Sequence, residues 1–265
     1  MHSSSLRTLL AATLLLAPCA AAAQGAAAFL DIPADARSAA MGGAGTALSA
    51  DAFSAFRNAA PLSSAETRAG GGYTYLPWMR SLIPETTLHA AAAYFKPNAK
   101  QAVSLGFRHF TQYGSERTDD NGNVLGRLRP RDMAFDIGYS RTIAKGLSAA
   151  LTGRYVRSDA GTGHTGNAVA FDAGLFYRQT LSRSHALNVG FQAANFGSGI
   201  DCGGDGQPLP WRLKAGVAAD LALAQAHRLT LTAEADWRLR PAESRAWSGR
   251  FGAEYRCCGI AALRG

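Results

Sequence analysis

Beyond its first residues, the sequence lacks any hydrophobic run near the roughly 20 residues that a transmembrane helix needs. Yet 47% of the residues are hydrophobic, and glycine is frequent, with 29 of 265 residues. The apolar residues must therefore be spread along the chain. A β-barrel spreads them in this way, because its strands alternate lipid-facing and lumen-facing side chains.

Cysteine is scarce, with four residues, and Cys19 lies in a leader segment described below. The other three, Cys202, Cys257 and Cys258, are an odd number and cannot form a closed disulfide framework. Neighbours on a strand point to opposite faces, so we do not expect Cys257 and Cys258 to share a metal ion. We expect all three cysteines to be structural.

Signatures of catalysis and of cofactor binding are also missing. Gly161, Gly163 and Gly166 match a dinucleotide-binding pattern in letters alone, because no strand, turn and helix surround them. A partial calcium-loop pattern at residues 119–123 lacks the correctly placed glycine and the closing glutamate. No serine has the context of a nucleophile. We therefore predict that the protein is not an enzyme and has no catalytic residue, cofactor or metal ion.

Acidic residues are outnumbered by basic residues, 19 to 27, which gives a net charge of +8 and a pI of about 9.6. Such a balance can reflect nucleic acid or an anionic membrane surface. The leader segment argues against nucleic acid. Three interpretations stay open: contact with outer-membrane lipid or lipopolysaccharide, contact with acidic cargo, or basic loops that have no specific partner.

The first 23 residues have the pattern of a secretory signal peptide. Arg7 supplies the basic region, Leu9–Leu16 the apolar region, and Ala20–Ala23 the small residues before cleavage. We predict cleavage at the end of this alanine run. The alternative is a lipoprotein signal acylated at Cys19, which Pro18 disfavours because a small residue is expected in its place.

From about Thr67 onward, polarity alternates with a period of two residues, which is typical of β-strands. In Leu229–Leu239, leucine, alanine and tryptophan alternate with threonine, glutamate, aspartate and arginine. The segments run to about ten residues, the length that crosses a bilayer when tilted. Strands of a soluble β-sandwich are nearer five or six residues. We predict an all-β, transmembrane antiparallel β-barrel over residues 67–265.

The polar faces of these segments carry many glycines, which suits a crowded lumen, and several charged residues. We expect the charged residues to form a network in the lumen: Arg108, Asp136, Arg154, Asp172, Glu234 and Asp236. The simple interpretation is solvation of the lumen and mutual ion pairing. The functional interpretation is a path through the barrel or a contact with cargo.

Short and long connections between the segments alternate strictly. The short ones are at residues 96–101, 144–146, 181–186, 223–227 and 258–259. The longer ones are at residues 77–86, 113–131, 158–166, 197–211 and 240–246. Bacterial barrels have short periplasmic turns and longer external loops. We therefore predict that the N-terminus lies in the periplasm.

We count ten whole strands and the start of an eleventh at Ile260–Arg264. A closed barrel in lipid needs an even number of strands, because an open edge leaves backbone groups unpaired. We therefore expect the barrel to be truncated at its C-terminus. The alternative is a ten-stranded barrel followed by a short tail.

Residues 24–66, between the signal peptide and the first strand, are not strand-like. The stretch is rich in alanine and glycine, includes Arg37, Met41 and Gly42, and has a short helix expected at Asp51–Arg57. Such a segment could be a linker or a plug that fills the mouth of the barrel.

Several stretches resemble the PorV/PorQ family of outer-membrane proteins, which is related to the FadL fatty-acid channels. The N-terminal signature is FLDIPADARSAAMGGAGTALSADAFSAFRNAAPLS, and the strands YTYLPWMRSL, RDMAFDIGYSRTIAKGLSAALTGRYVRSD, NVGFQAANFGSGI and FGAEYRCCGIAALRG continue it. The match covers essentially the whole mature chain. The long middle block favours the PorV branch of the family.

The resemblance implies a FadL-like barrel of fourteen strands in full-length members, with an N-terminal hatch that would include Arg37, Met41, Gly42 and Asn58. One departure concerns the hatch. The family usually has Asn-Pro-Ala, whereas here Asn58 is followed by two alanines and the proline comes one place late. Because proline fixes φ, we expect a looser hatch turn here.

The resemblance also implies a function in the type IX secretion system, in the outer membrane of a Gram-negative bacterium. The protein would collect secreted cargo that bears a C-terminal domain and pass it to a sortase-like attachment complex, alongside other type IX components. The alternative is a FadL-like channel for hydrophobic small molecules, and a third reading is a structural barrel or a lipid-A-modifying enzyme.

An apolar cluster is expected in the first external loop, and exposed apolar clusters often mark partner sites. Its members are Leu76, Trp78, Met79, Leu82 and Ile83. The cluster suits a contact with a protein partner, and it equally suits anchoring in the outer leaflet of the membrane.

Overall fold

The structure is a computed structural model, and it describes residues 27–265 except residues 80–84, 120, 122, 162, 183 and 202–205. The predicted signal peptide, Cys202, Leu82 and Ile83 lie outside the described residues. No helix in the described part of the chain has the length and apolar character to cross a membrane.

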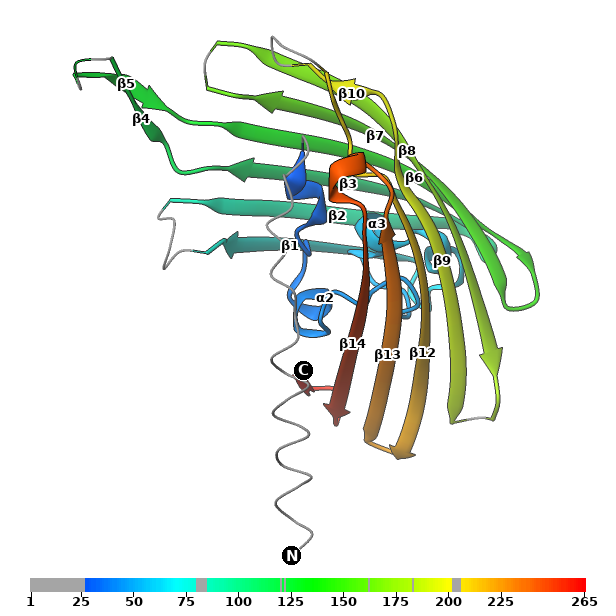
Figure 1. The fold of residues 1–265 in the computed structure, drawn as a ribbon. Coiled ribbons are helices and arrows are strands. Elements are labelled where there is room, and N and C mark those ends of the chain that lie inside the picture. Colours follow the sequence, from blue (N-terminus) through cyan, green and yellow to red (C-terminus); the bar gives the residue numbers. More distant parts are fainter. Residues whose placement is uncertain are drawn as a thin grey trace, which may run out of the picture.

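Eleven antiparallel strands form one curved sheet in the order β1-β2-β3-β6-β7-β8-β9-β12-β13-β14-β15 (Figure 1). Within the described residues, β1 and β15 are the two edges, so the sheet is open. The prediction of an all-β fold with ten whole strands and a short eleventh is confirmed. The strands are β1 Ala69–Pro77, β2 Thr87–Asn98, β3 Gln101–Thr111, β6 Arg131–Ala144, β7 Leu147–Asp159, β8 Thr165–Thr180, β9 His185–Gly197, β12 Arg212–Ala224, β13 His227–Arg238, β14 Ala246–Cys257 and β15 Ala261–Arg264.

The connections alternate in length as predicted, and they give the sheet two distinct ends. At the short-turn end lie the turns β2–β3, β6–β7, β8–β9, β12–β13 and β14–β15. At the long-loop end, two connections contain small hairpins of their own, β4 Ser115–Thr118 with β5 Val124–Leu128, and β10 Gly199–Ile200 with β11 Gln207–Pro208. A third contains the short helix η3 Ala242–Ser244.

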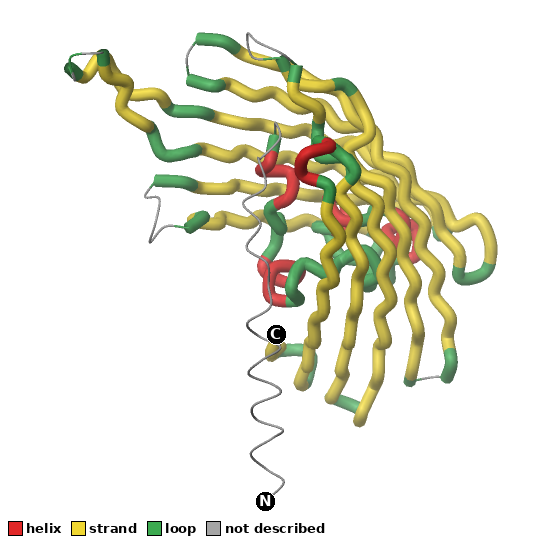
Figure 2. Tube along the Cα trace, in the orientation of Figure 1, coloured by secondary structure: helices red, strands yellow, loops and turns green. Residues whose placement is uncertain are grey.

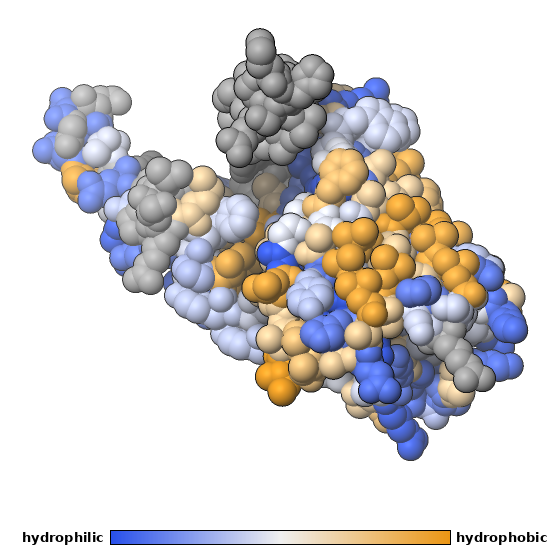
Figure 3. Space-filling model, turned by 90° about the horizontal axis from the view of Figure 1, so that it is seen from below, coloured by the Kyte–Doolittle hydropathy of each residue, from blue (hydrophilic) through white to orange (hydrophobic). Residues whose placement is uncertain are grey.

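Side chains alternate between the two faces of the sheet, and their polarity is the reverse of that in a soluble protein. Outward-facing residues are apolar and exposed, with Leu151 at 68% and Phe251 at 75%. Inward-facing residues include Arg154 and Asp136, which are buried. On the face seen from below, hydrophobic residues gather in broad patches on the surface (Figure 3). The alternation that the sequence predicts is therefore present, with the polar side inside.

The N-terminal segment lies on the concave, inner side of this wall, where short helices and loops gather (Figure 2). Its helices are η1 Ala28–Asp31, α2 Ala36–Ala40, α3 Ser54–Arg57 and η2 Ala60–Ser64. The helix expected from Asp51 begins three residues later, because the Asp51 carboxylate accepts the backbone N–H of Ser54.

This segment runs along the lumen from one end to the other. Phe29 stacks on Phe110 near the long-loop end, with ring centroids 6.3 Å apart. Arg37 pairs with Glu254, which lies near the short-turn end. Although β1 starts at the short-turn end, the first described residues lie at the opposite end. Their apolar side chains pack into the lumen beneath the long loops. The N-terminus itself lies outside the described residues, so its periplasmic placement stays a prediction.

An apolar cluster fills the lumen near the long-loop end. Phe29, Leu88, Phe110 and Val156 are among its buried members, and Trp78 is packed against it. Lower in the lumen, η2 contributes Leu62 to a second cluster, which also includes Phe176 of β8. The N-terminal segment therefore supplies apolar surface to a lumen whose wall is largely polar.

Glycines of the wall let the segment approach the strand backbones closely. A Cβ atom at Gly190 would lie 2.6 Å from the carbonyl carbon of Thr46. A Cβ at Gly252 would lie 2.6 Å from the carbonyl oxygen of Met41. No larger residue fits at these positions without moving the backbone of the segment. This explains the glycines on the polar faces of the strands.

The two adjacent cysteines depart from the prediction. Cys257 is the last residue of β14, whereas Cys258 has left the strand and has a φ of 56°. The rule that strand neighbours point to opposite faces therefore does not apply to them. Their Sγ atoms are 3.4 Å apart.

Candidate functional site

A chain of buried ion pairs crosses the inner faces of β3, β6, β7 and β8. Arg154 pairs with Asp136 and, at 3.0 Å, with Asp172. Arg108 pairs with Asp136 at 3.4 Å and donates to the carbonyl of Leu30 in the N-terminal segment. The charged residues predicted on these strands therefore do meet in the lumen, and each charge has an opposite partner.

Glu234 and Asp236 form a second group on β12, β13 and β14. Asp236 pairs with Arg212 at 2.6 Å and with Arg250 at 2.8 Å. Arg212 also pairs with Asp31 of the N-terminal segment at 2.9 Å. Arg212, Arg250 and Asp31 were not among the charged residues predicted for the lumen. The inward positions of both arginines in their strands would have identified them, whereas nothing local identifies Asp31.

The Glu234 carboxylate binds the backbone of the N-terminal segment. Its Oε2 accepts the N–H groups of Gly45 and Thr46, at 2.9 Å and 2.8 Å. Glu234 is 5% exposed, and Arg250 lies 3.4 Å from its other oxygen. The carboxylate is therefore satisfied by the segment on one side and by the wall on the other.

Arg37 holds the segment to the wall near the short-turn end. Its guanidinium donates to both oxygens of Glu254, at 3.1 Å and 3.2 Å, and pairs with Asp51 at 3.2 Å. Asp51 in turn pairs with Arg57 at 2.5 Å, and Arg57 pairs with Asp35 at 3.2 Å. These residues tie α2, α3 and β14 together.

Asp51 and Arg57 lie outside the strands, and their charges stabilise each other. Burial raises the pKa of Asp51, but the cations Arg57 and Arg37 outweigh it and leave the pKa below its usual 3.8. Burial likewise lowers the pKa of Arg57, but Asp51 and Asp35 outweigh it and leave that pKa above its usual value. Both groups are therefore charged at neutral pH.

Asn58 joins two parts of the N-terminal segment to β8. Its amide nitrogen donates to the carbonyls of Thr46 and of Leu175 in β8, at 3.0 Å each. Its side-chain oxygen accepts the N–H of Ala60 at 3.1 Å, and the residue is 2% exposed. The interaction with Ala60 closes the turn that the usual family proline would stiffen.

Met41 and Gly42, the other expected hatch residues, lie against β14. Met41 is fully buried in a small apolar cluster with Leu48 and Ala218. Gly42 has a φ of 64°, and a Cβ atom there would lie 2.5 Å from the carbonyl oxygen of Phe251. The structure thus brings all four expected hatch residues to the boundary between the segment and the wall.

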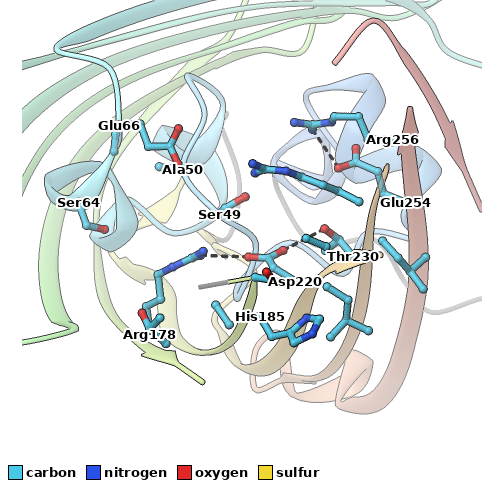
Figure 4. A pocket seen from close by; sticks show the side chains of 18 of the residues that line it. Ser49, Ala50, Ser64, Glu66, Arg178, His185, Asp220, Thr230, Glu254 and Arg256 are labelled. Atoms are coloured by element: carbon cyan, nitrogen blue, oxygen red, sulfur yellow. Dashed lines mark hydrogen bonds and ion pairs between the residues drawn. The ribbon is translucent and has the colours of Figure 1, made fainter. Parts of the chain in front are cut away.

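A polar cavity of about 490 Å³ opens between the segment and strands β8, β9, β12, β13 and β14 (Figure 4). On its lining, Asp220 pairs with Arg178 at 3.0 Å and accepts the Thr230 hydroxyl at 2.9 Å. Across the cavity, Glu254 pairs with Arg256 at 3.0 Å. No group of three metal-ligating side chains occurs among the described residues.

The first long loop is only partly exposed where the structure describes it. Leu76 and Trp78 pack against the apolar cluster of the lumen. Met79 is 46% exposed. Leu82 and Ile83 lie outside the described residues. Of the five residues expected to contact a partner, Met79 is thus the described member with an exposed side chain.

Basic side chains also gather on the outer face near the long-loop end, a cluster that was not predicted from the sequence. His89 and His109 face each other across β2 and β3, with ring centroids 6.3 Å apart. Arg131 and Arg157 are exposed on β6 and β7, and neither makes an ion pair with any described residue. All four residues have odd numbers, like the outward-facing residues of these strands, and this signal could have predicted that they lie on the outer face.

The family model for the type IX secretion system protein PorV matches residues 20–245 of the chain. The chain belongs to the PorV family. Membership of the PorV family makes it an outer-membrane component of the type IX secretion system, so the exposed apolar face of its sheet meets lipid. The polarity of the two faces follows, because lipid rewards apolar side chains outside.

Among solved structures, the chain is similar to an in-vitro folded OmpT in its trimer form, an outer membrane protein of Vibrio cholerae. The TM-score is 0.43 at 9% identity, and the match covers 80% of this chain and 72% of that chain. This likeness is weak. No curated protein matches the chain.

Proposed function

We propose that this PorV-family protein binds secreted cargo through the cargo's C-terminal domain and carries it to the sortase-like attachment complex at the cell surface. The observation that supports the proposal most is the family match over residues 20–245. In this proposal the cargo is bound by the loops at the long-loop end, which faces the outside. The lumen holds the N-terminal segment and serves to keep the wall rigid.

In this proposal Arg37, Met41, Gly42 and Asn58 keep the segment seated as a hatch. Their contacts with Glu254, Phe251 and Leu175 support that role. The alternative, a channel for hydrophobic molecules, calls for an apolar pocket beside the hatch. The cavity beside the segment is instead lined by arginines, aspartate and glutamate, so this alternative is not favoured.

The secretome tests the proposal. We would delete the gene and quantify proteins on the cell surface, in the medium and in the periplasm by mass spectrometry. Proteins that share a C-terminal domain should leave the surface and accumulate in the periplasm, and the intact gene should restore them. An unchanged secretome would contradict the proposal, and uptake of a labelled fatty acid would then test the channel.

The first long loop is the proposed contact with cargo or attachment components, through Leu76, Trp78, Met79, Leu82 and Ile83. Within it, Met79→Asp places a charge on an exposed side chain and should reduce surface cargo when it replaces the wild-type gene. Leu181→Asp is the matched control, because Leu181 is 65% exposed at the short-turn end. Equal loss in both variants would argue against the loop.

The outward basic residues are the proposed contact with phosphate groups of outer-leaflet lipopolysaccharide. His89, His109, Arg131 and Arg157 lie near the long-loop end on the outward face, and this gathering of basic side chains supports a lipid headgroup as their partner. Arg131→Gln combined with Arg157→Gln should lower the amount of lipopolysaccharide that copurifies. Arg228→Gln, at an exposed position of the short-turn end, should leave it unchanged.

A further inference from the structure

The turn between β14 and β15 brings two thiols together on one side of the chain. Cys258 donates its N–H to the carbonyl of Ala226 at 2.6 Å, and Ile260 donates to the carbonyl of Cys257 at 3.1 Å. These bonds fix the turn while the Sγ atoms of Cys257 and Cys258 lie 3.4 Å apart. Cys258 is exposed and Cys257 is half-buried.

We infer that Cys257 and Cys258 form a reversible disulfide with each other, so that this turn is a redox-responsive site. The sulfur atoms are already in contact, and a disulfide bond of about 2 Å needs only a small further approach. Both cysteines are free thiols in the structure. A further cysteine, Cys202, lies more than 50 residues away from this pair along the chain.

The chemistry is thiol–disulfide exchange with an oxidant of the cell envelope, namely a protein that carries a disulfide. The exposed thiolate of Cys258 attacks one sulfur of that disulfide, and the displaced sulfur leaves as a thiolate. Cys257 then attacks Cys258 in the mixed disulfide and releases the second thiolate. The two cysteines lose two electrons and two protons, and the donor disulfide becomes two thiols.

The compartment favours the oxidised form. Disulfides form and persist in the oxidising environment of the bacterial cell envelope, whereas cytosolic thiols are kept reduced. Membership of the PorV family places this chain in the outer membrane. The exposed face of Cys258 leaves it open to an incoming protein.

The bond should be easy to reverse, because neighbouring residues are too close for a relaxed disulfide. Their Cα atoms are about 3.8 Å apart across a trans peptide, whereas disulfides usually join Cα atoms about 4.4–6.8 Å apart. Strained and exposed disulfides are reduced more readily than structural ones. A bond between neighbours also closes almost no loop, so it restricts the unfolded chain very little. Such a disulfide is therefore suited to sensing the redox state of its surroundings and adds little to the stability of the fold.

The sequence makes the test direct. Trypsin cleaves after Arg256 and Arg264, so both thiols fall on the single peptide 257–264. Outer-membrane fractions from cells expressing the chain would be quenched with N-ethylmaleimide before digestion and mass spectrometry. We expect this peptide unlabelled and lighter than the dithiol by two hydrogen atoms. Prior incubation with reduced glutathione should convert it to the doubly labelled form.

Two variants serve as controls. Cys202→Ser should leave the result unchanged, because Cys202 takes no part. Cys258→Ser should give a Cys257 that is fully labelled without reduction, while the protein still folds and inserts. Double labelling of the wild-type peptide under oxidised glutathione would overturn the inference. So would recovery of Cys257 or Cys258 joined to Cys202.

Discussion

The two faces of the same sheet differ in which kind of side chain is exposed: apolar residues on the outer face and polar residues, buried, on the inner face. On the outer face, Leu151 and Phe251 are among the most exposed large hydrophobic side chains of the described residues, whereas Arg154 and Asp136 on the inner face are nearly inaccessible. In a soluble protein these exposures would be reversed. This difference shows that the surroundings of each face decide which side chains it carries. Lipid solvates one face, and the N-terminal segment fills the space against the other.

The inner face is therefore where single changes should cost most, and the outer face offers matched controls for each of them.

Replacing Arg154 by alanine should have the largest effect. It leaves Asp136 and Asp172 without their shared cation, and removing one partner of a buried ion pair costs about 3–5 kcal/mol. The control Leu151→Ala removes an outward leucine from the same strand, where lipid contact is worth only about 0.5 kcal/mol. The stability of both variants is measured by urea unfolding in lipid vesicles, with the folded fraction read from heat-modifiability on gels. Equal losses of stability in the two variants would contradict the role of the inner face as the packed core of the protein.

Asn58→Ala should release the N-terminal segment without unfolding the wall. The change removes the donor to the carbonyls of Thr46 and Leu175 and the acceptor of the Ala60 N–H, and each buried group left unpaired costs about 1–3 kcal/mol. Trypsin should then cut the segment faster in the inserted protein. Asn167→Ala, which removes an exposed outward amide that accepts from Tyr155, should not change the cutting rate.

Gly190→Ala should push the segment away from β9. The added Cβ would lie 2.6 Å from the Thr46 carbonyl carbon, and overpacking of this kind costs about 1–3 kcal/mol. Gly153→Ala is the control, because its nearest neighbour is a ring carbon of Phe171 at 3.9 Å. Differential scanning calorimetry in detergent should show a lower Tm for the first variant alone. A matching drop in the second would point to a general cost of alanine in these strands.

Acid should loosen the segment around Asp51 with a modest effect. The folded pKa of Asp51 lies below its usual 3.8, so its contribution to stability is present above that value and is lost as the pH falls through the lowered pKa. The Arg57 contribution is fully present throughout this range, because its pKa is raised. The protection factors of residues 35–57 in hydrogen–deuterium exchange, corrected for the pH dependence of intrinsic exchange, should be constant down to about pH 4 and fall below it. Asp51→Asn should abolish that step.

The strands were predictable from the sequence because their signal is local. A period of two in Leu229–Leu239 requires no knowledge of neighbouring strands, and the observed β13 spans His227–Arg238. The alternation of short and long connections followed in the same way. The start of the chain was less predictable, because the path of residues 27–31 depends on Phe110 and Arg212, more than 70 residues away along the chain.

The residues of the candidate site also fall into two groups, those that the sequence could predict and those that it could not. Arg108, Asp136, Arg154 and Asp172 could be assigned to the lumen from alternation alone. The partners of Arg37 could not, because Glu254 lies 217 residues further along the chain. Likewise, the pattern of a strand predicted that Cys257 and Cys258 point apart, and the turn at Cys258 reversed that prediction.

By itself, the sequence determined which residues form strands, how many strands there are and which side chains share a face, because the pleat of a strand alternates side chains independently of its neighbours. Only the tertiary structure decided which charges meet, how Asn58 joins the segment to β8, and that two neighbouring thiols touch. These features depend on distances between segments far apart in the chain, and such distances are fixed only when the sheet curves around the N-terminal segment.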